Sequence, residues 1–142
     1  MDEKRPNRND GCKAMVRQAY TSRMSQVRKL WTLYKKDPEA SDEVYGSWNE
    51  YGLAFDYVPP GTWEDQKRGY FRYQISYGGP SEEFRFYCDE NLFITRCEFW
   101  FLDWFDGADV PVIKGALDVW REIWEDFREC GTLEYQMKQA NT

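Results

Sequence analysis

The stretch GYFRYQISYGGPSEEFRFYCDENLFITRCEFWFLDW, residues 69–104, decides the fold of this chain. Apolar and polar side chains alternate along most of it, which is the period of a strand with one buried face. Turn residues at 78–80 and 89–91 break the pattern twice. The stretch therefore predicts three strands of an antiparallel meander, over residues 69–77, 83–88 and 93–104.

The alternation also predicts which face of the meander is buried. The apolar side chains of the first two strands that share a face are Phe71, Tyr73, Ile75, Tyr77, Phe84, Phe86 and Cys88. We expect helices to cover this face. Residues 99–102, Phe-Trp-Phe-Leu, are apolar at every position, so both faces should be covered there.

Short and irregular elements flank the meander. Residues 53–58 are a candidate fourth strand, closed by two prolines and a glycine. Residues 39–51 predict a short helix with Ser41 as its N-cap, although Gly46 weakens that helix. Residues 106–111 read as a loop that ends the meander.

Helical spacing appears at both ends of the chain. Apolar residues recur every three or four positions over 13–36, and Asp37–Pro38 ends that pattern. The same spacing over 112–129 places Trp120 and Trp124 in an apolar stripe. We expect an α+β fold in one domain of 142 residues, with an N-terminal helix, a meander of three to four strands, and a C-terminal helix packed on the sheet. Residues 1–10 and 132–142 are expected to be flexible tails.

The charge of the chain is divided between its two parts. The first 36 residues hold ten lysines and arginines against three acids, a net charge of +7. The rest hold nine bases against 22 acids, a net charge of −13, which leaves −6 for the whole chain. A basic arm on an acidic body is typical of a protein that contacts a macromolecule through electrostatics.

Several kinds of chemistry lack the residues that they need. The chain has no histidine, so the commonest general base and the commonest metal ligand are missing. It has no nucleotide-binding glycine motif. We therefore predict a protein that is not an enzyme and needs no cofactor. The least favoured alternative is a histidine-free enzyme with paired carboxylates; its candidate pairs are Glu82 with Glu83, Asp103 with Asp106, and Glu64 with Asp65.

The cysteines and aspartates do not predict a metal site. No two cysteines have the CxxC spacing of a zinc site, and we expect all four to be free thiols. Asp103, Asp106 and Asp109 are three apart, but the loop lacks the ligand spacing of an EF-hand. The start of the chain has no apolar segment typical of a signal peptide, so we expect a cytoplasmic location and no membrane contact.

Two charged surfaces are candidate binding sites. Acids recur at helical spacing on the predicted C-terminal helix and form a stripe that could imitate the phosphates of a duplex. With the exposed aromatic and acidic positions outside the helix, the predicted partner-binding residues are Asp118, Glu122, Glu125, Asp126, Glu129, Trp63, Asp103 and Asp106. The alternative is nucleic-acid binding by the basic helix 13–36, through Arg17, Arg23, Arg28 and Lys29.

Residues 51–108 also resemble a known family. This segment carries the pattern GYxRYQxSxGGPSxEFRFY followed by FWFLDWFDGA, and it is similar to a small family carried by bacterial plasmids and phages. The family has no assigned activity. The resemblance implies a mobile-element setting, in which small acidic proteins often inhibit CRISPR or restriction systems.

These observations together predict a binding protein without enzymatic activity. We expect it to inhibit a host defence complex that handles nucleic acid, such as a CRISPR effector or a restriction enzyme, by occupying a basic groove. The alternative from another class is a nucleic-acid-binding accessory protein that uses helix 13–36.

Overall fold

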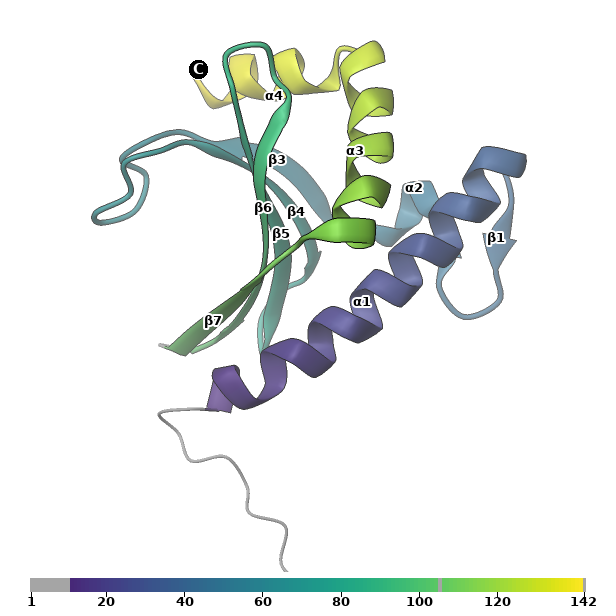
Figure 1. Cartoon of the computed structure of the whole chain (residues 1–142), viewed down its shortest axis with the longest axis horizontal. Helices are drawn as coiled ribbons and strands as arrows, with labels where there is room; N and C mark the ends of the chain where they lie inside the picture. The colour runs from purple at the N-terminus through teal and green to yellow at the C-terminus, as the bar shows by residue number, and fades with distance from the viewer. Residues whose placement is uncertain (1–10, 105, 142) are drawn as a thin grey trace, which may run out of the picture.

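The chain folds into a five-stranded antiparallel sheet with its helices on one side (Figure 1). The structure is a computed structural model that describes residues 11–104 and 106–141. The five strands lie in the sheet in the same order as in the chain, so hairpin connections join all of them. They are β3 (Ala54–Val58), β4 (Tyr70–Ser76), β5 (Ser81–Cys88), β6 (Ile94–Asp103) and β7 (Asp106–Pro111).

The three strands predicted from alternation are present as β4, β5 and β6. Phe84 pairs with Tyr73 on one side and with Phe99 on the other, so aromatic rings form rows across the inner face. Tyr77 lies beyond the end of β4 and is exposed, although the alternation predicted it on the buried face. The predicted strand over 53–58 is β3, at one edge of the sheet.

The loop predicted over residues 106–111 is wrong, because this segment forms β7. Ala108 and Val110 are buried while Gly107 and Asp109 are exposed, so a short alternation is present. Pro111 ends the strand at the edge of the sheet, where a missing N–H costs no ladder hydrogen bond. The meander therefore has five strands instead of three or four.

The segment from 39 to 51 is also different from its prediction. The strands β1 (Ser41–Asp42) and β2 (Gly46–Ser47) form a small hairpin, and the helix α2 covers only Trp48–Tyr51. The Asp42 carboxylate accepts hydrogen bonds from the backbone N–H groups of Val44 and Tyr45, at 2.9 and 3.0 Å. Gly46 has a φ of 76°. This side-chain-to-backbone turn competes with a helix that would start at Ser41.

Three longer helices cover the inner face of the sheet. They are α1 (Gly11–Lys36), α3 (Lys114–Glu129) and α4 (Thr132–Ala140). The first two confirm the predicted helices within two residues at each end. In place of the flexible tail predicted from residue 132, α4 packs against β3, and Leu133 is fully buried. The predicted tail over 1–10 lies outside the described residues.

Tryptophans of α3 form the centre of the core. Trp120 packs against Phe84 and Phe86, with ring centroids 4.8 and 4.9 Å apart. Trp124 contacts Phe86 at 4.8 Å, and its indole N–H donates a 2.8 Å hydrogen bond to the carbonyl of Leu92. Both tryptophans are essentially inaccessible to solvent. The helix is therefore anchored on β4 and β5 by rings, as the apolar stripe predicted.

No helix covers the outer face of the sheet in the part of the chain that the structure describes. Figure 1 shows the helices on one side, while the β3–β4 connection extends on the other. The expectation that both faces would be covered near residues 99–102 is therefore wrong: Trp100 and Leu102 point outward and are only half-buried. Among the described helices, none is long and apolar enough to span a bilayer.

Candidate functional site

The outer face of the sheet carries a buried ion pair between two aromatic rings. The Arg85 guanidinium lies 4.0 Å from the centre of the Trp100 ring and 4.8 Å from that of Tyr70. Its Nε donates a 2.7 Å hydrogen bond to Glu83, whose side chain is only 2% exposed. Cation–π contacts and a charge-assisted hydrogen bond together fix the guanidinium.

A second arginine lies directly across the strand pair. Arg72 is the register partner of Arg85, and like charges in this position normally destabilise a sheet. Arg72 forms a two-point contact with Asp56, with Nε–Oδ1 and Nη2–Oδ2 distances of 3.0 and 2.7 Å. Each arginine therefore has its own carboxylate, and the centre of the outer face is polar but nearly neutral.

A third ion pair extends this polar ladder towards β7. Glu98 is buried and accepts hydrogen bonds from Arg96 Nε at 2.6 Å and from Trp100 Nε1 at 3.0 Å. Asp109 lies nearby, and burial, followed by repulsion from Glu98, raises the pKa of its carboxyl group. These contacts hold Trp100 in place beside Arg85, so the ring orientation on this face is fixed from both sides.

Exposed aromatic side chains surround a hollow on this face. The hollow has a volume of about 420 Å³ and is lined by Trp63, Arg72, Gln74, Tyr77, Ser81, Glu83, Arg85 and Leu102. A second hollow of about 350 Å³ shares Tyr77, Ser81 and Leu102 with the first and reaches Trp104. We call the three exposed rings, Trp63, Tyr77 and Trp104, the aromatic rim. They are 52%, 79% and 87% exposed.

Turns and loops place the three rings of the aromatic rim. Trp63 lies in the β3–β4 connection, where its indole N–H donates a 2.9 Å hydrogen bond to the Tyr70 hydroxyl. Tyr77 follows the last residue of β4. Trp104 lies in the tight turn between β6 and β7, with a φ of 56°, a left-handed conformation that side-chain-bearing residues rarely adopt. Three strongly exposed aromatic rings around contiguous hollows are typical of a surface that contacts a partner.

The structure separates the predicted partner-binding residues. Trp63 is on the aromatic rim. Asp103 and Asp106 are paired across the β6–β7 turn and lie beside the start of α1, where Asp106 accepts the N–H of Cys12 at 3.2 Å. That hydrogen bond is the main reason why the pKa of Asp106 is lowered. Both aspartates therefore belong to the contact between the sheet and α1.

The acidic stripe is present on α3, but part of it is engaged. Glu122 accepts hydrogen bonds from Lys35 at 2.7 Å and from the Trp31 indole at 3.1 Å, and these contacts lower the pKa of its carboxyl group. Glu125 pairs with Arg128 on the same helix at 2.9 Å. The stripe residues that form no ion pair within the described residues are Asp118, Asp126 and Glu129.

Two of the four arginines and lysines proposed for nucleic-acid binding are held by acids of the body. Arg23 forms a two-point contact with the buried Glu82, with a shortest distance of 2.7 Å. Lys29 contacts Asp42 at 2.7 Å. Arg17 and Arg28 are exposed, and neither makes an ion pair with another described residue. The basic face of α1 is therefore partly neutralised.

The candidate carboxylate pairs do not form a common catalytic site. Acidic side chains are rarely buried, but Glu82 and Glu83 both are, and they point to opposite faces of the sheet, each towards an arginine. Glu64 and Asp65 are exposed in the β3–β4 connection. Within residues 11–104 and 106–141, no cluster of histidine, cysteine or acidic side chains could hold a metal ion.

All four cysteines are free thiols, as predicted. Cys88 pairs with Ile94, while Cys97 lies opposite Phe86. Burial raises the pKa of Cys88 to about 12 and that of Cys12 to about 11. Because thiolates are the reactive form, these two cysteines are poor nucleophiles at neutral pH.

Sequence reasoning missed the aromatic rim except for Trp63. One signal was present: the run Phe99–Leu102 is apolar at positions of both faces, and we interpreted its outer positions as core. Comparison with known proteins adds no further assignment, because no family model, no curated protein and no solved structure matches this chain.

Proposed function

We propose that this chain is a non-enzymatic binding protein that docks on a protein partner through its aromatic rim. One observation carries the proposal: three strongly exposed aromatic rings surround contiguous hollows on a sheet face that no described helix covers. Tryptophan, tyrosine and arginine dominate the binding energy of protein interfaces. This face presents all three, and its arginines are already held in fixed orientations.

The net charge defines the chemistry of the partner. At −6, the protein is attracted to a positively charged surface, and charge complementarity accelerates encounter more than it strengthens binding. A basic nucleic-acid groove is such a surface. We therefore propose that the partner is a host complex that handles nucleic acid, of the CRISPR or restriction kind. The net negative charge would accelerate the encounter, while the aromatic rim supplies the contact.

A plasmid-transfer experiment tests this function in cells. A host carrying an active restriction or CRISPR system is transformed with a targeted plasmid while it expresses the protein. We expect the wild-type protein to raise the number of transformants relative to an empty vector. Because the rim rings are exposed, Trp104→Ala and Tyr77→Ala should keep the melting temperature and lose most of this effect.

Tyr135→Ala is the matched control for the rim variants. Tyr135 is 58% exposed on α4, away from the outer face, so its truncation removes a similar area of ring from the surface. We expect this variant to protect the plasmid like the wild type. If the rim variants also protect it fully, the aromatic rim is not the binding face. If the wild type protects against none of the tested systems, the proposed partner class is wrong.

A further inference from the structure

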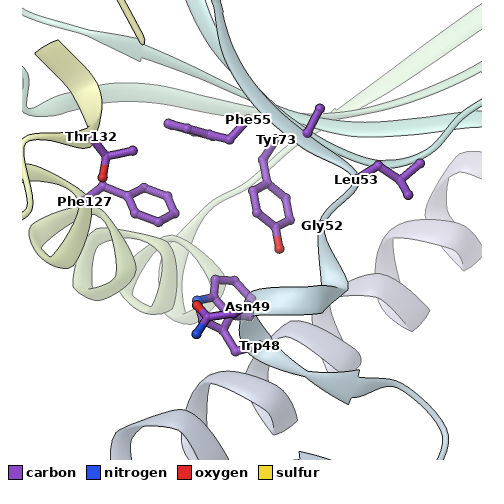
Figure 2. A pocket seen from close by; sticks show the side chains of 9 residues that line it. Trp48, Asn49, Gly52, Leu53, Phe55, Tyr73, Phe127 and Thr132 are labelled. Atoms are coloured by element: carbon purple, nitrogen blue, oxygen red, sulfur yellow. The ribbon is translucent and has the colours of Figure 1, made fainter. Parts of the chain in front are cut away.

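A separate pocket lies on the helix side of the sheet, between α2 and the junction of α3 with α4 (Figure 2). Its volume is about 280 Å³. We call it the lateral pocket; it is lined by Trp48, Asn49, Gly52, Leu53, Ala54, Phe55, Tyr73, Phe127 and Thr132. These residues come from five elements (α2, β3, β4, α3 and α4) and the α2–β3 connection, so the pocket forms only in the folded chain.

None of the residues that line the lateral pocket is charged. This composition is unusual for a chain in which 31% of residues are charged. An ionised ligand would lose hydration there without gaining a counter-ion, which is costly. The lining therefore selects for a neutral molecule.

Aromatic rings form the walls of this pocket. Trp48 and Tyr73 are stacked, with an interplanar angle of 8° and centroids 5.7 Å apart. Phe55 and Phe127 form a second pair with centroids 4.8 Å apart. In Figure 2, Phe127 and Tyr73 face each other across the pocket, with Trp48 and Asn49 below them. Flat walls of this kind favour a planar ligand that can stack on them or meet them edge-on.

The lateral pocket also has a hydrogen-bonding edge. The Tyr73 hydroxyl lies against the backbone of Gly52, and burial raises the pKa of Tyr73, so the hydroxyl keeps its proton and can donate a hydrogen bond. Tyr73 is only 6% exposed, and its hydroxyl donates to no side chain among the described residues. The side chains of Asn49 and Thr132 likewise make no hydrogen bond within that part of the chain. The O–H of Tyr73 is thus available to an acceptor in the pocket.

Gly52 permits this arrangement. A Cβ atom at this position would lie 2.6 Å from Cζ of Tyr73 and 2.7 Å from its hydroxyl oxygen. No real side chain tolerates such distances, so the ring could not reach its present place beside the backbone. The absence of a side chain at residue 52 therefore positions the hydroxyl at the pocket wall.

We propose that the lateral pocket binds a small, neutral, planar aromatic molecule that carries a hydrogen-bond acceptor. The ring of this ligand packs among Phe55, Tyr73 and Phe127, and its acceptor accepts a hydrogen bond from the Tyr73 hydroxyl. The site is distinct from the aromatic rim, which lies on the opposite face of the sheet. Binding here is independent of the function proposed above.

Titration by NMR with three small probes tests the ligand class. Benzamide is neutral and has a carbonyl acceptor, benzoate has the same shape with a charge, and indole has no comparable acceptor. We expect saturable shifts of the Gly52, Leu53 and Thr132 amides with benzamide at millimolar concentrations. Benzoate should bind about tenfold more weakly, because its charge would be desolvated. Absence of saturable shifts with benzamide, or equal binding of benzoate, overturns the proposal.

Tyr73→Phe tests the role of the hydroxyl while keeping the ring. We expect this variant to bind benzamide about 3- to 10-fold more weakly, which is the range of one hydrogen bond, and to bind indole as the wild type does. An equal loss for both probes, or no loss for benzamide, contradicts the proposed contact. Asn49→Ala, at an exposed position of α2, should retain the discrimination between benzamide and benzoate. Trp104→Ala should leave the titration unchanged, which separates this site from the aromatic rim.

Discussion

Glu82 and Glu83 are adjacent in sequence, yet their side chains stabilise different surfaces of the protein. Glu82 anchors Arg23 of α1 on the inner side, and Glu83 orients Arg85 on the outer side. Sequence reasoning could not separate buried from solvated acids, because the arginines that neutralise them come from distant or alternate positions. The aromatic core was predictable, since alternation already placed Phe84 and Phe86 inside.

The two core tryptophans offer a matched comparison at the residue scale. We expect Trp120→Ala and Trp124→Ala each to lower the free energy of unfolding by about 3–5 kcal/mol. The phenylalanine variants should differ from each other. Trp124→Phe leaves the Leu92 carbonyl without its indole donor, whereas the indole N–H of Trp120 has no hydrogen-bond partner among the described residues.

We therefore expect Trp124→Phe to cost about 1 kcal/mol more than Trp120→Phe in chemical denaturation. Both variants lose the same number of ring atoms, so the comparison isolates the hydrogen bond. Equal denaturation midpoints and equal m-values for the two phenylalanine variants would contradict a contribution from the hydrogen bond to Leu92.

Asp42 should link stability to acid pH. Its salt bridge with Lys29, followed by the backbone N–H groups of Tyr45 and Val44, lowers the pKa of its carboxyl group to about 2. Because the folded-state pKa lies below the unfolded one, the stabilisation is present above about pH 4 and is lost as the pH falls towards 2. We expect Asp42→Asn to be less stable than the wild type at pH 6, and we expect most of this difference to be lost at pH 2. A difference of the same size at pH 6 and pH 2 would mean that the charge is not responsible.

The long elements were predictable and the short ones were not. Over α1, α3 and β4 to β6, many residues share one period, so the pattern outweighs local exceptions. The alternation in β7 covers only two buried residues, and the hairpin of β1 with β2 has too few residues for any period. They depend on a neighbouring strand or on the Asp42 turn. The helix α4 depends on Leu133, whose burial needs β3 and α3 in place.

The contact of α3 with α1 can be tested at the element scale. If the acidic stripe were only a solvent-exposed surface, reversing the charges of Glu122 and Glu125 would leave the fold intact. Since Glu122 binds Lys35 and the Trp31 indole, we now expect Glu122→Lys to lower the free energy of unfolding by about 1 kcal/mol. Asp118→Lys on the same helix is the control and should stay within about 0.5 kcal/mol of the wild type. Equal melting temperatures of the two variants would mean that the contacts of Glu122 with Lys35 and Trp31 do not stabilise the fold.

At the scale of the whole molecule, the contrast between basic arm and acidic body is partly resolved by internal contacts. Arg23, Lys29 and Lys35 each bind a carboxylate outside α1. These pairs fasten the helix to the rest of the protein and remove charge from the surface that nucleic acid would use. Because each ion pair is neutral, the net charge stays at −6. The sequence gives this value directly, but only the fold shows which charged side chains are left unpaired.

We therefore expect weak binding to random duplex DNA. At physiological salt, fluorescence anisotropy should give a dissociation constant well above 1 μM. Few basic side chains of α1 remain available to bind phosphates, and the acidic remainder of the protein repels DNA. Arg17→Ala combined with Arg28→Ala should change this value little. A micromolar or tighter constant that this double variant abolishes would favour the accessory-protein alternative, in which α1 contacts phosphates.

The positions of the three rim rings have a consequence for how the protein can evolve. Trp63, Tyr77 and Trp104 all lie in connections between strands, and none takes part in a strand ladder. Such positions accept exchange, insertion and deletion at little cost to the core. Substitutions in one connection between strands can therefore change the recognition surface, while the sheet and its helices stay the same. A scaffold of this kind can follow a partner that mutates to escape it.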